Sequence, residues 1–133
     1  MKPGKGVFVC LVAALAPCVA CSSPAQRIDS HREAFESLGA TTVLIVQAWL
    51  AGDVPGTYAR TSLDATFRLV EKERTALARR PQDIAGPDGA SLSQTAERLS
   101  RVVAELVDDV RTGNGDAARD RVSRIPILPA EAR

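Results

Sequence analysis

Apolar residues recur every three or four positions along most of the chain, which is the spacing of amphipathic helices. The first such stretch follows Ser30-His31-Arg32-Glu33, a Ser-x-x-Glu capping box that places hydrogen-bond acceptors on otherwise unpaired backbone N–H groups. Its apolar stripe consists of Phe35, Leu38, Thr42, Ile45, Val46, Trp49 and Leu50. Residues 41–46 also have strand propensity, but the helical spacing on both sides outweighs it. The pattern predicts a helix over residues 30–52.

A turn at Asp53-Val54-Pro55-Gly56 leads to a second amphipathic stretch that runs to Arg80. Its apolar positions are Tyr58, Leu63, Phe67, Val70 and Leu77. Residues 81–89 contain two prolines and two glycines, so we expect the longest loop of the domain there.

A second capping signal, Ser91-Leu92-Ser93-Gln94, opens a third predicted helix. Its apolar positions follow the spacing of a bundle seam: Leu92, Ala96, Leu99, Val103, Leu106 and Val110. This helix is expected to end at Gly113-Asn114-Gly115, and Asp116 to cap a shorter fourth helix that ends at Pro126. Residues 127–129 are expected to pack against the end of the bundle.

These elements predict an all-α fold, an up-down-up-down bundle of three long helices and one shorter helix. The connections after the first and third helices are short enough to force antiparallel neighbours. We assign the bundle to residues 30–129 and a C-terminal tail to residues 130–133.

The first twenty residues have the pattern of a secretory signal peptide. Lys2 and Lys5 precede an apolar run from Val7 to Ala20. That run has 14 residues, whereas a membrane-spanning helix needs about 20. Small side chains lie one and three positions before Cys21, as expected for cleavage after Ala20. We therefore predict a cleaved signal peptide over residues 1–20 in front of the bundle.

The segment Ala16-Pro17-Cys18-Val19-Ala20-Cys21 resembles the lipobox of bacterial lipoproteins, although Cys18 lies where a branched aliphatic residue is more common. The resemblance implies that the Cys21 thiol receives a diacylglyceryl group and becomes an acylated N-terminus. Ser22 after the cysteine implies an outer-membrane destination in a Gram-negative cell. Residues 21–29, rich in Ser, Pro and small polar residues, are interpreted as a tether between the lipid and the bundle.

Cysteine usage supports lipidation independently, because Cys21 is the only cysteine after residue 20. An unpaired thiol is unusual in an exported protein, since an oxidising compartment drives it into disulfides. Acylation removes that thiol, and two or more acyl chains hold a protein on a membrane stably. The alternative is a soluble exported protein with a free Cys21.

Composition excludes a nucleic-acid binder. The chain of 133 residues has 17 Lys and Arg against 16 Asp and Glu, and 4% aromatic residues. It therefore has neither the basic excess that neutralises phosphates nor the aromatic platforms that stack on bases.

The sequence lacks the sets of ligating side chains that metal and cofactor sites require. His31 is the only histidine, Met1 the only methionine, and no Cys-x-x-Cys-His segment is present. A single imidazole cannot supply a zinc, copper or di-iron site, and we expect no metal and no cofactor. The interpretation of His31 is a solvent-exposed residue in the first helical turn.

Catalytic motifs are also missing. No Gly-x-Ser-x-Gly elbow occurs, and the Gly-x-Gly-x-x-Ala match at residues 113–118 follows a helix, which favours a helix cap over a nucleotide loop. The carboxylate pairs Glu33/Glu36, Glu71/Glu73 and Asp108/Asp109 are interpreted as solvated, as are the interleaved charges Asp109, Arg111, Asp116, Arg119, Asp120, Arg121 and Arg124. We predict no catalytic residues and no enzyme.

Trp49 and Tyr58 flank the first turn, so they should lie at one end of the bundle. Both can close the core there, with their polar atoms in water. The alternative is that they contact a partner, because such aromatic residues dominate interface hot spots.

The sequence thus predicts a lipid-anchored bundle of the bacterial cell envelope, facing the periplasm, that acts by protein–protein contact. Its expected partners are the membrane and an unidentified envelope protein, with a second copy of the chain left open. The alternative is a bundle that binds a small apolar ligand, with residues 81–89 as a lid.

Overall fold

The computed structural model describes residues 22–125, in which all regular secondary structure is helical. The helices are α1 (Pro24–Leu50), α2 (Gly56–Ala78), α3 (Pro81–Ile84), α4 (Pro87–Thr112) and α5 (Gly115–Ser123). The predicted all-α class is confirmed for these residues. The predicted signal peptide, Cys21 and the residues after 125 lie outside the described part of the chain.

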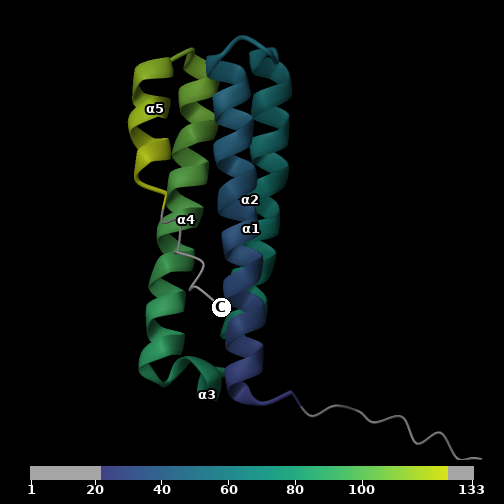
Figure 1. Cartoon of the computed structure of the whole chain (residues 1–133), viewed down its shortest axis with the longest axis vertical. Helices are drawn as coiled ribbons and strands as arrows, with labels where there is room; N and C mark the ends of the chain where they lie inside the picture. Colours follow the sequence, from purple (N-terminus) through teal and green to yellow (C-terminus); the bar gives the residue numbers. More distant parts are fainter. Residues whose placement is uncertain (1–21, 126–133) are drawn as a thin grey trace, which may run out of the picture.

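Three long helices, α1, α2 and α4, lie side by side along the long axis of the molecule (Figure 1). Helix α3 lies at the end where α1 and α4 begin, which we call the α3 end. Helix α5 packs on α4 and α1 near the opposite end, which we call the α5 end.

The core runs between the long helices and is built from the predicted stripes. All six predicted seam positions of α4 are buried, from Leu92 to Val110. Phe35 and Val46 of α1, and Leu63 and Val70 of α2, complete its centre. The prediction fails at Tyr58, which is 58% exposed. Nowhere in residues 22–125 is a helix both long and apolar enough to cross a bilayer.

Helix α1 begins at Pro24, six residues before the predicted start. Ser23 is the N-cap: its Oγ accepts from the Gln26 N–H at 3.2 Å, and Gln26 Oε1 accepts from the Ser23 N–H at 2.9 Å. The earlier cap prevails because it lets Ile28 enter the core, where it is 6% exposed. The tether predicted over residues 21–29 is therefore wrong for residues 24–29, which are helical, and Ser30 lies within α1.

The loop predicted over residues 81–89 is also wrong. Pro81 and Pro87 each lie in the first turn of a helix, α3 and α4, with Gly86 rather than Ser91 at the N-cap of α4. Proline suits this place because its missing N–H would have no partner in the first turn. Only Ala85 and Gly86 separate the two helices, so the segment offers no lid.

The cap interpretation of residues 113–118 is confirmed. Gly113 ends α4 in the left-handed region, with φ of 70°. Asn114, not Asp116, caps α5, because its side chain accepts from the Ala117 N–H at 3.1 Å. Helix α5 ends at Ser123, before the predicted Pro126.

Candidate functional site

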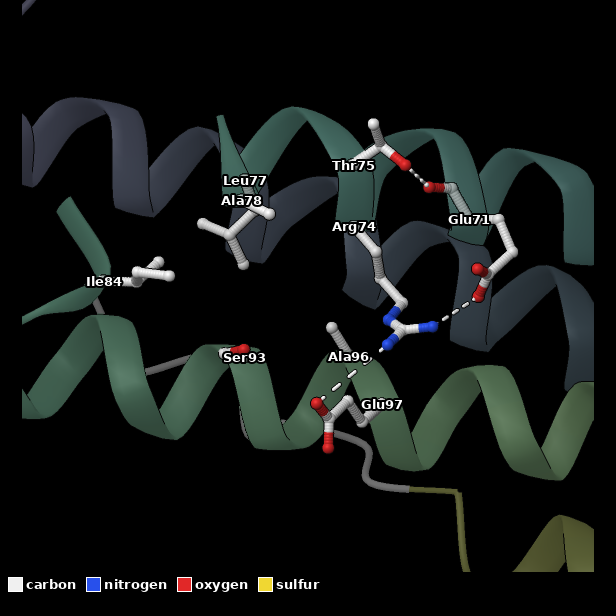
Figure 2. Close-up of a pocket in the computed structure, with 9 residues that line it drawn as sticks. All are labelled: Glu71, Arg74, Thr75, Leu77, Ala78, Ile84, Ser93, Ala96 and Glu97. Atoms are coloured by element: carbon white, nitrogen blue, oxygen red, sulfur yellow. Dashed lines mark hydrogen bonds and ion pairs between the residues drawn. The ribbon is translucent and has the colours of Figure 1, made fainter. Parts of the chain in front are cut away.

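A shallow cleft lies between α2 and α4, beside α3 (Figure 2). It has a volume of about 250 Å³ and is lined by Glu71, Arg74, Thr75, Leu77, Ala78, Ile84, Ser93, Ala96 and Glu97. Sites for small organic ligands are generally larger, at about 300 to 1,000 Å³, and mostly apolar. The cleft suits a small polar group better than the apolar ligand of the alternative prediction.

Arg74 spans the charged part of this cleft. Its guanidinium donates to Glu71 Oε1 at 2.7 Å and lies 4.0 Å from Glu97 Oε1 across the cleft (Figure 2). Ser100 Oγ of α4 also donates to Glu71, at 2.5 Å. The Ser100 hydrogen bond, followed by the Arg74 hydrogen bond, lowers the pKa of Glu71. Glu71 is thus held as a carboxylate, the opposite of what a general acid requires.

A second cluster ties α1 to α3 at the α3 end. Arg27 Nε and Nη2 donate to the two oxygens of the Asp83 carboxylate, each at 2.8 Å. The third nitrogen, Nη1, donates to the backbone carbonyl of Ser22. Asp83 is 8% exposed, and the Arg27 hydrogen bond lowers the pKa of its carboxyl group. One guanidinium therefore holds together the first described residue, the start of α1, and α3.

His31 extends this cluster to α2. Its Nδ1 lies 2.5 Å from Glu73 Oε1, and its side chain is 20% exposed. The predicted place of His31 in an exposed first turn is therefore wrong, because α1 starts six residues earlier and directs this position toward α2.

A third cluster lies between α4 and α5. Asp109 is 5% exposed, and its Oδ2 accepts from Arg121 Nε at 2.6 Å. Arg121 also donates to Glu105, and the Asp109 hydrogen bond is the main cause that raises the pKa of Arg121. Asp109 and Arg121 are thus not on a solvated face, as the sequence suggested; they attach α5 to α4.

The two aromatic candidates lie at the α5 end, but in different surroundings. Trp49 packs against the core, and its Nε1 lies next to Gly56 at the start of α2. Tyr58 projects into solvent. Two further hydrophobic residues, which the apolar stripes did not single out, are exposed: Leu44 (67%) and Leu69 (51%). Both lie off the three-and-four spacing of their helix stripes, which is the signal that could have found them.

Among residues 22–125, no group of three or more His, Cys, Asp or Glu side chains is placed to hold a metal ion. A comparison with protein-family models found no match, and comparisons with curated proteins and with solved structures found none either.

Proposed function

We propose that this protein is a lipid-anchored component of the bacterial cell envelope, an up-down-up-down bundle that acts by contact with another protein rather than by catalysis. The observation that carries the proposal is the export signal with its lipobox-like ending at Cys21, directly in front of a helical domain. In this arrangement the acylated cysteine becomes the N-terminus and fixes the bundle to the membrane.

Three bonded carboxylates support a structural role. Asp83 and Asp109 are buried, and each is bound by one arginine from another helix. Glu71 is half-buried and is bound by Arg74 and Ser100. Charge-assisted bonds of this kind orient the helices that carry the partners.

The exposed hydrophobic residues supply the contact. Tyr58, Leu44 and Leu69 are the large apolar side chains that α1 and α2 leave in water. Tyrosine is enriched at interface hot spots, because it has apolar area and a hydroxyl group on a stiff side chain. We assign Tyr58 to the partner contact and Trp49 to the core.

The first test is the intact mass of the full chain after expression in bacteria and extraction from membranes. We expect the mass of residues 21–133 with a diacylglyceryl group, with or without a further acyl chain. Cys21→Ser is the matched control and should lose that mass and the membrane association together. An unmodified mass for the wild type contradicts the anchor.

The second test introduces a photo-crosslinking amino acid at Tyr58, Leu44 or Leu69 in cells, with exposed Gln94 of α4 as the control position. We expect one discrete adduct from the first group and none from Gln94. Equal labelling at all four positions, or none at any, contradicts a partner contact at these side chains.

A further inference from the structure

The described chain starts at the α3 end, immediately after Cys21 (Figure 1). Only Ser22 and Ser23 separate Cys21 from Pro24, the first residue of α1. Each residue spans at most about 3.6 Å, so this two-residue spacer is short. A lipid on Cys21 therefore brings this end of the bundle to the membrane surface.

Arg27 limits the orientations that the bundle can take relative to the lipid on Cys21. Its guanidinium binds the Ser22 carbonyl and the Asp83 carboxylate at once, so the exit of the chain is fixed to α3. A flexible tether would leave the orientation free, whereas the capped start at Ser23 and this bond do not.

Two basic side chains lie at the α3 end, where α2 ends. Arg79 and Arg80 follow the end of α2 and are exposed. Within residues 22–125 neither forms an ion pair within 4.0 Å, although Arg80 also attracts the Asp83 carboxylate.

We infer that the α3 end of the bundle faces the membrane and that Arg79 and Arg80 contact anionic phospholipid headgroups. The inference rests on the lipid anchor proposed above for Cys21. Basic side chains next to a membrane attachment are attracted to anionic lipids over about one Debye length, which matches two arginines at the end where the chain exits. The α5 end, with Tyr58, then points away from the membrane toward the partner.

The sole tryptophan tests this orientation directly. Acylated full-length protein, verified by mass, is placed in phosphatidylcholine–phosphatidylglycerol vesicles that contain lipids with a nitroxide on the headgroup. Trp49 of the wild type lies at the far end of a helix about 40 Å long and should keep its fluorescence. Gln82→Trp in a Trp49→Phe background places the reporter on α3, and we expect it to lose most of its fluorescence. If Trp49→Phe does not fold, Gln82→Trp beside Trp49 should lose about half of the total signal, as expected for one of two tryptophans within reach of the nitroxide.

Arg79→Gln with Arg80→Gln tests the lipid contact in the same reporter. We expect its quenching to fall to the level seen in vesicles of phosphatidylcholine alone. The matched control is Arg60→Gln with Arg68→Gln, which removes the same charge from exposed positions of α2 and should leave the quenching unchanged.

The outcomes separate the two proposals. A sample that carries no acyl group overturns the anchor, and this inference with it. Acylated protein in which Trp49 and the α3 reporter are quenched equally, or Trp49 more, overturns the orientation alone. Equal effects of the two arginine pairs overturn the headgroup contact.

Discussion

Two buried carboxylates determine how the small helices attach to the large ones. Asp83 joins α3 to α1 through Arg27, which lies 56 residues away, and Asp109 joins α4 to α5 through Arg121, 12 residues away. Sequence patterns give no information on such pairs, because charged residues are assigned to the surface unless a partner is known. The Arg27–Asp83 and Asp109–Arg121 pairs were therefore beyond prediction, whereas the apolar stripes were not.

Trp49 and Tyr58 are predicted to differ sharply in their effect on stability. Trp49→Ala leaves a cavity beside Gly56 and should lower the free energy of unfolding by about 2 to 3 kcal/mol, somewhat less than for a fully buried tryptophan. Tyr58→Ala should change it by less than about 0.5 kcal/mol, since the side chain is in water. Urea unfolding followed by far-UV circular dichroism measures both. If Trp49→Ala left the free energy of unfolding unchanged, Trp49 would not belong to the core and would again be a candidate for the partner contact.

At the scale of elements, periodicity predicted α1, α2, α4 and α5 but missed α3 and misplaced the starts of α1, α4 and α5. All seam positions of α4 were predicted, because apolar residues that alternate between spacings of four and three indicate a helix and not a strand. Starts were missed because Ser-x-x-Gln at Ser23 and Ser-x-x-Glu at Ser30 are equivalent patterns, and only the packing of Ile28 distinguishes them. Likewise, Pro81 and Pro87 start helices as readily as they interrupt them.

Two glycine substitutions should have opposite signs. A Cβ at Gly89 would lie 2.3 Å from the Asp83 carbonyl oxygen and 2.5 Å from Ile84 Cα, so Gly89→Ala must displace α3 from α4. We expect a loss of about 1 to 3 kcal/mol. At Gly39, within α1, the nearest atom to a Cβ would be Ile125 Cγ2 at 3.5 Å, an ordinary contact. Gly39→Ala should therefore stabilise the fold by about 0.5 to 1 kcal/mol through helix propensity.

Thermal unfolding of the two variants beside the wild type checks both signs. A melting temperature for Gly89→Ala at or above that of the wild type would show that the close approach of α3 to α4 is not maintained in solution. A lower melting temperature for Gly39→Ala would show that a Cβ there does not fit against Ile125 and Leu99.

Substitutions at Gly113 test the left-handed backbone conformation that ends α4. Its φ is 70° and a Cβ at this position would meet open space, so Gly113→Ala carries only conformational strain, about 1 to 2 kcal/mol. Asparagine adopts this conformation more readily, and Gly113→Asn should lose clearly less stability. Chemical denaturation gives the comparison, and equal losses for the two variants would contradict a left-handed cap.

At the scale of the whole molecule, three ion-pair clusters connect the helices around one apolar core. The link at each end involves an arginine with a buried carboxylate, and the Glu71 link lies between them. Because Arg27 and Arg121 have raised pKa values, they stay charged at all ordinary pH. Loss of the Arg27 link on titration must therefore come from its partner carboxylate, Asp83.

Stability should accordingly fall in acid. The folded-state pKa of Glu71 lies below its ordinary 4.5, and that of Asp83 below its ordinary 3.8. An acid with a lowered folded pKa binds fewer protons in the folded than in the unfolded state. Its stabilisation is complete above the ordinary value and is lost as the pH falls through the folded one. We expect the melting temperature to be flat from neutral pH to about 5 and then to decrease steeply.

Glu71→Gln and Ser100→Ala show whether the acid slope arises from the named contacts. The first removes the titrating group, and the second removes the hydrogen bond that contributes most to lowering its pKa. Both should make the decrease below pH 5 shallower, while the Asp83 contribution remains at lower pH. Ser100→Ala keeps the carboxylate, so a shallower slope in that variant assigns the effect to the α2–α4 hydrogen bond rather than to charge removal. A wild-type slope in both variants would show that Glu71 and Ser100 are not bonded in solution, and that α2 and α4 are joined by their apolar seam and the Arg74–Glu97 contact.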